Sequence, residues 1–299
     1  MVLYKVARKE VSRMDLFFDL LRSVIYGVIE GITEWLPISS TGHMILAEQV
    51  LKFSLSAEFM EMFRVVIQLG AIMAVVVLYF KKLWPFCGDN GCDSGLAKHI
   101  RWPVLRLWLK IIVACLPAAV LGLLLDDWMD AHFYNSVVVA VMLIVYGIAF
   151  ILIERRPRVP ATTKLSRITY KQAIIVGAWQ VLALIPGTSR SGATIIGGLL
   201  CGMSRACASQ FTFFLAIPVM AGASGLKLVK FLVGGGVFTV AEVGALLVGC
   251  IVAFVVSIMA IRFLMDYVKK HTFTIFGWYR IALGILVLGI WALQSFVLA

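Results

Sequence analysis

The chain has 299 residues, of which 62% are hydrophobic and only 14% are charged, and its mean hydropathy is +0.98. Soluble domains are about 45–50% apolar and about 25% charged, so this composition excludes an ordinary soluble protein, and the many apolar residues exclude a disordered chain. The formal charge of +11 does not indicate a nucleic-acid partner, because the basic residues gather in loops between apolar blocks, as in integral membrane proteins.

The first 22 residues carry charges throughout and contain no apolar core followed by a small-residue cleavage site, so we expect no cleaved signal peptide. Apolar side chains on one helical face favour an amphipathic surface helix instead. The residues on this face are Leu16, Phe17, Leu20 and Leu21. Residues 23–299 are predicted to form a single membrane domain.

Six apolar runs approach the ~20 residues that a helix needs to cross a hydrocarbon layer of ~30 Å. They are residues 60–80, 109–125, 137–153, 211–233, 240–261 and 276–298. Two further apolar blocks, 23–36 and 173–185, would reach only about 20 Å, and each is followed by a proline. Short broken segments of this kind indicate re-entrant helical hairpins whose irregular backbone is buried or lines a wet cavity.

The charges of the loops predict the topology. The loops that follow residues 80 and 153 are strongly basic, and the short turn between the two intervening spans is acidic, with Asp126, Asp127 and Asp130. Basic loops stay in the cytoplasm, so we expect the acidic turn outside. The same alternation places both termini outside.

The two halves of the chain resemble each other. The segment LPISSTG at 36–42 compares with IPGTSRSG at 185–192, and each follows one of the short apolar blocks. Related halves of opposite orientation form an inverted-topology repeat whose broken segments meet near the membrane midplane. The predicted fold is an all-α polytopic membrane protein with about six full transmembrane helices, two re-entrant helical hairpins, and inverted repeats at approximately 23–153 and 172–298.

A cluster of polar residues accompanies the first short block. Glu30 and Glu34 lie one helical turn apart, and two ionised carboxylates at membrane depth need protonation, a basic partner or a cation. His43 can act as a general acid or base, as a phosphoryl-accepting nucleophile or as an orienting donor. Ser39 and Thr41 fit helix capping best, whereas for Ser40 capping and chemistry are equally open.

The second polar cluster follows residue 185. Arg190, flanked by Ser189 and Ser191, is hard to explain as packing, because its guanidinium stays charged and its fork matches phosphate oxygens. A helix that starts near Ser191 adds N–H donors, and Thr194 lies one turn further. A structural salt bridge from Arg190 to one of the two glutamates is the alternative, and the two interpretations are compatible.

Other polar residues carry less weight. Gln68 lies within a span and is expected to bond to a re-entrant backbone. The six cysteines form no paired framework, and none has the spacing of a zinc site. Four charged residues near span ends are expected at the membrane surface, where snorkelling or lipid headgroups suffice: Glu61, Glu242, Arg262 and Arg280.

These residues together predict a cavity at membrane depth that holds a carboxylate pair, hydroxyls, one histidine and one arginine. Such a cavity suits an anionic, phosphorylated substrate that stays in the lipid. It does not suit ion conduction, which uses rings of carbonyls or of like charges. The pattern alone does not separate hydrolysis of this substrate from its transport.

With these motifs the chain resembles the undecaprenyl-diphosphate phosphatase family of bacteria, also called the bacitracin-resistance protein family. The resemblance rests on EGITEWLPISSTGH at 30–43, VVIQLG at 65–70 and PGTSRSGAT at 186–194. It implies hydrolysis of undecaprenyl diphosphate to undecaprenyl phosphate and inorganic phosphate, which recycles the carrier lipid for cell-wall synthesis and confers bacitracin resistance. It also implies a multi-pass protein of the bacterial cytoplasmic (inner) membrane, commonly dimeric, whose site opens to the outer, periplasmic face.

The resemblance implies roles for individual residues. Arg190 and its flanking serines would clamp the terminal phosphate while Ser40 or His43 attacks, and a Mg²⁺ or Ca²⁺ ion would bind at Glu30 and Glu34. The catalytic candidates are Glu30, Glu34, Ser40, His43 and Arg190. The substrate-binding candidates are Ser39, Thr41, Ser189, Ser191, Thr194 and Gln68.

Two other functions, and one other family that cleaves the same lipid, compete with this interpretation. A flippase for undecaprenyl phosphate fits the same inverted repeat, and phosphate release by the purified protein in detergent would distinguish the two. The phosphatidate-phosphatase-like membrane family is rejected, because Ile196 stands where that family needs a histidine. A purely structural scaffold leaves Arg190 and the glutamate pair unexplained.

Overall fold

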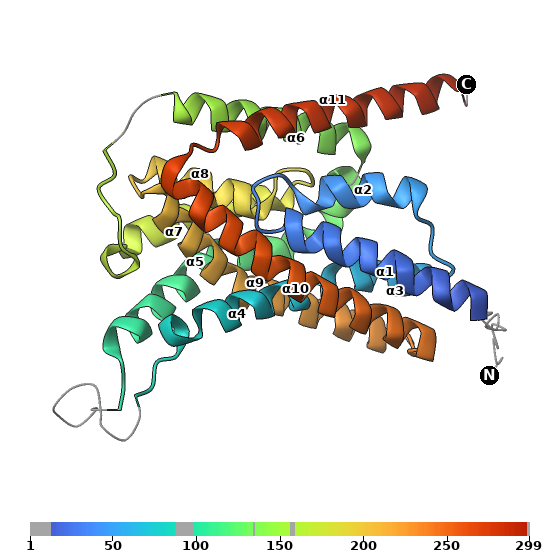
Figure 1. The fold of residues 1–299 in the computed structure, drawn as a ribbon, viewed down its shortest axis with the longest axis horizontal. Helices are drawn as coiled ribbons and strands as arrows, with labels where there is room; N and C mark the ends of the chain where they lie inside the picture. Colours follow the sequence, from blue (N-terminus) through green and yellow to red (C-terminus); the bar gives the residue numbers. More distant parts are fainter. Residues whose placement is uncertain (1–12, 88–98, 134, 156–158, 298–299) are drawn as a thin grey trace.

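The protein's structure is a computed structural model that describes residues 13–87, 99–133, 135–155 and 159–297. This part of the chain is helical, with two isolated β-bridges and no strand (Figure 1). The helices are α1 (Arg13–Thr33), α2 (Ser40–Val50), α3 (Ala57–Val66), α4 (Gln68–Leu83), α5 (Trp102–Phe133), α6 (Ser136–Glu154), η1 (Leu165–Arg167), α7 (Tyr170–Val181), η2 (Leu182–Leu184), α8 (Arg190–Leu200), α9 (Arg205–Val233), α10 (Val240–Lys270) and α11 (Thr274–Val297).

Within the described residues, six helical segments are long and apolar enough to cross a membrane, which confirms the six predicted spans. They are Ala57–Leu83, Trp102–Leu125, Ser136–Glu154, Arg205–Val233, Val240–Lys270 and Thr274–Ser295. Most exceed the predicted run, because capping and basic residues continue the helix beyond its apolar core. Glu242, for example, closes a capping box with Thr239 at the start of α10, so its predicted place near a span end is confirmed, but it is buried, so its predicted contact with lipid headgroups is wrong.

The predicted surface segment 1–22 is described only in part. Residues 1–12 lie outside the described residues, and residues 13–22 form the first part of α1, which continues to Thr33 without a break. The buried Asp19 carboxylate accepts hydrogen bonds from Arg22 Nη1 at 2.7 Å and from Ser54 N at 3.1 Å. These bonds attach the start of α1 to the loop that follows α2.

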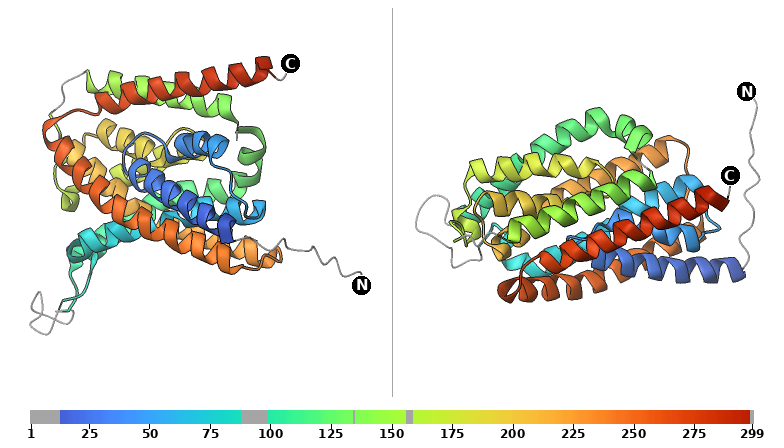
Figure 2. Two further views of the ribbon diagram at one scale, coloured as in Figure 1. Left: turned by 45° about the vertical axis from the view of Figure 1, so that its right-hand side comes forward. Right: turned by 90° about the horizontal axis from the view of Figure 1, so that it is seen from above.

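Helices that are distant in the sequence pack in pairs. α1 lies along α10 and α6 lies along α11 (Figure 2), while α7 packs against α5. Gly27 shows how close the first pair comes, because a Cβ atom there would lie 2.7 Å from the carbonyl oxygen of Gly249. This close approach holds the C-terminal part of α1, which carries Glu30, in a fixed position.

The turns that precede α2 and α8 share an uncommon backbone. Ser39 has φ 74° and Ser189 has φ 70°, a left-handed region that non-glycine residues rarely adopt. Each of these serines is the N-cap of its helix, and its hydroxyl accepts a hydrogen bond from the amide of Gly42 (3.4 Å) or Gly192 (3.2 Å). The same strained turn therefore opens both polar motifs.

The cysteines correct one expectation. Cys115, Cys201, Cys207 and Cys250 are free, as predicted, but Cys87 is disulfide-bonded. The prediction that no cysteine is paired is therefore wrong at Cys87. Nothing in its local spacing distinguished a disulfide from a pair of free thiols.

Candidate functional site

The two polar motifs meet through Glu34 and Arg190. Arg190 is the first residue of α8, and its Nη2 and Nε atoms donate to Glu34 Oε1 at 3.0 and 3.2 Å. Only 11% of the Arg190 side chain and 7% of the Glu34 side chain are exposed, so the ion pair is nearly excluded from solvent. The predicted salt bridge between the halves is present, and it neutralises the carboxylate that the sequence places at membrane depth.

Ser40 lies on the other oxygen of the same carboxylate. Its hydroxyl donates to Glu34 Oε2 at 2.8 Å, and its side chain is half-buried at the start of α2. Glu34 thus holds a guanidinium on one oxygen and a hydroxyl on the other. A hydroxyl that donates to a carboxylate is positioned to lose its proton to it when it attacks a substrate.

Arg190 is held in place from behind by threonines. Its Nη1 donates to the carbonyl oxygen of Thr212 at 3.1 Å. The Thr194 hydroxyl lies 2.9 Å from the carbonyl oxygen of Arg190 and accepts from the Thr212 hydroxyl, also at 2.9 Å. Thr194 is fully buried, so its hydroxyl supports the first turn of α8 and does not face a cavity.

The serines beside Arg190 mainly order the turn. Ser189 Oγ accepts from the amide of Gly192 and lies 3.2 Å from Ser191 Oγ. The Ser191 hydroxyl donates across the halves to the carbonyl oxygen of Leu36 at 3.4 Å. Ser39 likewise caps α2, as the sequence predicts. These hydroxyls build the site, and only a rotation of their side chains would turn them toward a ligand.

His43 faces a residue that sequence reasoning missed. Its Nδ1 lies 2.7 Å from the carbonyl oxygen of Ser39, and its Nε2 lies 2.7 Å from the hydroxyl of Tyr279 in α11. These partners assign the neutral ring with Nδ1–H donating to Ser39 and Nε2 accepting from Tyr279. Among the described residues no hydrogen bond joins His43 to Ser40, Glu34 or Arg190. No sequence spacing singles out Tyr279.

Arg280 corrects the prediction that it lies at the membrane surface. It is completely buried, and its guanidinium donates to backbone carbonyls of both motif turns: Nη1 to Pro37 at 3.2 Å, and Nη2 to Gly187 and Thr188 at 2.9 Å each. Two longer bonds reach carbonyls of α6. Irregular turns leave carbonyl oxygens without helical partners, and these oxygens satisfy the buried cation. The signal in the sequence was an arginine inside the last apolar run.

Glu30 is the site's unpaired carboxylate. It is 1% exposed, and its Oε1 is buried without a hydrogen-bond partner. Such a group at membrane depth requires a proton or a cation. No cluster of three or more His, Cys, Asp or Glu side chains that could hold a metal occurs in the described part of the chain. Glu30 can therefore offer an ion one carboxylate ligand, with any further ligands coming from neutral oxygens.

A cavity of about 790 Å³, here called the main cavity, is lined by Glu30 and Ser40, whereas Glu34, His43 and Arg190 are not among its lining residues. This volume lies within the ~300–1,000 Å³ of typical ligand sites. Its lining combines carboxylate, hydroxyl and amide groups with two basic side chains. The lining residues are Glu30, Ser40, Thr41, Met44, Ala57, Glu58, Glu61, Arg64, Val65, Gln68 and Lys227.

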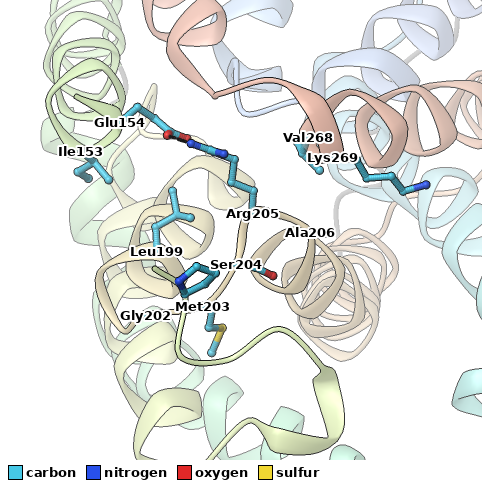
Figure 3. A pocket seen from close by; sticks show the side chains of 11 residues that line it. Ile153, Glu154, Leu199, Gly202, Met203, Ser204, Arg205, Ala206, Val268 and Lys269 are labelled. Atoms are coloured by element: carbon cyan, nitrogen blue, oxygen red, sulfur yellow. Dashed lines mark hydrogen bonds and ion pairs between the residues drawn. The ribbon is translucent and has the colours of Figure 1, made fainter. Parts of the chain in front are cut away.

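A second hollow, of about 300 Å³, lies where α6 and α10 end and α9 begins (Figure 3). Arg205, which lines it, donates to both carboxylate oxygens of Glu154, and the amide of Phe273 donates to the same carboxylate. Both basic residues of this hollow are thus already matched by an anion, since Lys269 pairs with Asp266. None of the predicted site residues lines it, so it is not the candidate active site.

Comparison with known proteins identifies relatives over nearly the whole chain. A family model described as "Bacitracin resistance protein BacA" matches residues 23–286. An undecaprenyl-diphosphatase of Enterococcus faecalis is 60% identical over 278 residues, which cover 92% of this chain and 99% of that protein. A protein of the same name from Lactococcus lactis subsp. lactis is 57% identical over 90% of this chain and 96% of that protein. Another, from Desulfitobacterium hafniense, is 57% identical over 90% of this chain and 95% of that protein.

Proposed function

Because the chain belongs to the bacitracin resistance protein BacA family, we propose that it is a membrane phosphatase that hydrolyses undecaprenyl diphosphate to undecaprenyl phosphate and inorganic phosphate. The observation that carries the proposal is the bonding of Glu34 to both Ser40 and Arg190, beside a cavity that reaches the surface. Hydrolysis recycles the carrier lipid for cell-wall synthesis, and removal of the diphosphate form accounts for bacitracin resistance.

Arg190 binds the terminal phosphate. A guanidinium has five N–H groups, and the bonds to Glu34 and Thr212 use three of them, which leaves one on each Nη atom. Two such donors match two phosphate oxygens, and the amides of the first turn of α8 add positive potential. Charge that develops on the transferring phosphoryl group is stabilised by donors that are already in place.

Ser40 is the nucleophile that this arrangement favours. Its Oγ bonds to the terminal phosphorus while the bond from that phosphorus to the bridging oxygen breaks, and undecaprenyl phosphate leaves with the bridging oxygen. Glu34 Oε2, at 2.8 Å, receives the hydroxyl proton. Water then cleaves the phosphoserine to inorganic phosphate and restores Ser40. His43 holds the carbonyl of Ser39 and so positions the turn that carries Ser40.

A Mg²⁺ or Ca²⁺ ion fits this site at Glu30. Glu30 lines a cavity that Ser40, Thr41 and the Gln68 amide also line, and these are the oxygen donors that both ions prefer. Glu34 contributes less to binding of the ion than the sequence suggests, because both of its carboxylate oxygens already accept hydrogen bonds. When bound, the ion would neutralise diphosphate charge and polarise a phosphoryl oxygen.

We further propose that the fold is an inverted repeat with two re-entrant hairpins. Three features support this: the matching positive-φ serines before α2 and α8, the 11-residue length of both helices, and the packing of α1 on α10 and of α7 on α5. A helix of 11 residues spans only about 16 Å, roughly half of the hydrocarbon layer.

The main cavity is proposed to open to the outer face of the bacterial cytoplasmic membrane. The start of α3 and the end of α9, which both line it, lie toward the end of the molecule where α1 begins and α11 ends (Figure 1). The helix ends that flank the two basic loops lie at the opposite end, and basic loops stay in the cytoplasm. The homodimer implied by the family remains a prediction, which cross-linking in native membranes would test.

Phosphate release by the purified protein in detergent tests the proposed activity, because detergent micelles offer no compartments for transport. We expect release of inorganic phosphate from a prenyl diphosphate, and loss of this release in a folded Arg190→Ala variant. Binding of the lipid without release of phosphate would support a carrier and overturn the proposal.

A further inference from the structure

Two basic side chains of the main cavity have no part in the chemistry above. Arg64 of α3 and Lys227 of α9 both line it. Arg64 Nη1 donates to Glu48 Oε1 at 2.5 Å, and Lys227 Nζ donates to Glu61 Oε1 at 2.8 Å. Basic residues this far along apolar helices normally reach outward to lipid headgroups, but these two lie against a cavity.

Both cations line the cavity, and their acidic partners differ in this respect, because Glu61 lines it and Glu48 does not. The Lys227 side chain is 18% exposed and its partner Glu61 is 61% exposed, while Arg64 is 27% exposed and Glu48 32%. Arg64 therefore meets the cavity without its acidic partner, whereas Lys227 meets it together with Glu61.

A prenyl diphosphate carries a second phosphate that the site at Arg190 does not account for. In the proposed mechanism the terminal phosphate lies at Arg190 beside Ser40, and the other phosphate, attached to the lipid, needs a separate position in the cavity. We propose that Arg64 and Lys227 form a second phosphate subsite, which binds the phosphate that stays on the lipid and selects diphosphates over monophosphate esters. This inference rests on the proposed function.

The subsite has a consequence for both products. The lipid monophosphate keeps its phosphate on Arg64 and Lys227 after cleavage, whereas inorganic phosphate occupies only the position at Arg190. Glu61 competes with the lipid phosphate for Lys227, because it already occupies that ammonium group. Removal of the Glu61 charge should therefore strengthen binding of the lipid, and removal of either cation should weaken it.

Inhibition by the two products tests this subsite. In neutral detergent, we expect Arg64→Met and Lys227→Met each to raise the inhibition constant of a prenyl monophosphate about tenfold or more, the effect of one lost charged hydrogen bond. The inhibition constant of inorganic phosphate should stay within about twofold. Glu61→Gln should lower the constant for the prenyl monophosphate. Lys230→Met is the matched control, because Lys230 lies one turn beyond Lys227 on α9 and does not line the cavity.

Three results would overturn the subsite: equal effects on both products, no effect of either cation, or weaker binding in Glu61→Gln. Competition by phosphatidylglycerol as strong as that by the prenyl monophosphate would instead assign the two cations to bilayer lipid and also contradict the proposal. Affinity for a non-hydrolysable methylene-bridged prenyl diphosphonate gives a readout independent of turnover. A wild-type protein that binds this analogue at Arg64 and Lys227 but releases no phosphate would disprove the activity and not the subsite.

Discussion

Replacement of Arg280 by methionine tests the claim that one buried guanidinium holds the two motif turns together. Methionine fits the apolar surroundings but leaves the carbonyls of Pro37, Gly187 and Thr188 without their donor. An unsatisfied buried acceptor costs ~1–3 kcal/mol, so the three together cost roughly 3–9 kcal/mol. Removal of a fully buried charge offsets several kcal/mol of this. The expected net loss of stability is of order 3 kcal/mol.

Thermal unfolding in detergent measures this loss, and phosphate release measures its effect on the site. A loss of ~3 kcal/mol lowers the Tm of a protein this large by roughly 10 °C. Activity should fall at least about tenfold even well below the Tm, because the turns carry Ser40 and Arg190. Arg262→Met is the control: Arg262 is an exposed arginine of α10, where a substitution changes stability by about 0.5 kcal/mol or less.

Arg280→Lys separates the charge of the side chain from its geometry. A lysine keeps the positive charge, but its single ammonium group cannot reproduce the fork that reaches both turns. We expect a Tm between those of wild type and Arg280→Met. Wild-type Tm and activity in Arg280→Met would refute the reasoning, because they would mean that the two turns are ordered without this residue.

Three further substitutions test separate parts of the account. Ser40→Ala should reduce phosphate release at least about 10³-fold with an unchanged Tm. Thr41→Ala, on the same cavity, should reduce phosphate release less than about tenfold. Equal losses of activity in the two variants would show that Ser40 is not the nucleophile. Glu30→Gln should abolish any stimulation by added Mg²⁺ or Ca²⁺ in the same assay, and unchanged stimulation would place the ion elsewhere. Gly70→Ala should unfold at least several degrees earlier, because its Cβ would lie 2.1 Å from the carbonyl oxygen of Cys250; an unchanged Tm would show that α4 and α10 can separate there.

The sequence allowed the six spans to be predicted, because each is one continuous apolar run. It also allowed the pairing of Arg190 with a glutamate to be predicted, because an ionised group at membrane depth needs a partner of opposite charge. The sequence does not show which of the two glutamates pairs with Arg190. Glu30 and Glu34 share a helical face, and only the tertiary arrangement places Glu34 beside α8 and leaves Glu30 on the cavity wall.

Other features depend on backbone geometry that leaves no trace in residue type. A positive φ is expected at glycine, so the serines at positions 39 and 189 do not indicate the left-handed backbone that they adopt. Arg280 was misplaced because its distance from the start of the last apolar run fits a snorkelling side chain as well as a buried one. The partnership of His43 with Tyr279 joins residues 236 positions apart, and neither residue type requires the other.

The joint action of Glu34 and Arg190 is the claim on which the mechanism depends most directly, and a double-mutant cycle measures it. Phosphate release from a prenyl diphosphate would be compared for wild type, Glu34→Gln, Arg190→Met and the double variant, all checked to be folded. Residues that act as one unit give strongly non-additive losses, so we predict that the double variant is no slower than the slower single variant. Losses that multiply in the double variant would show that the two residues act independently, and would contradict a single centre built from both motifs.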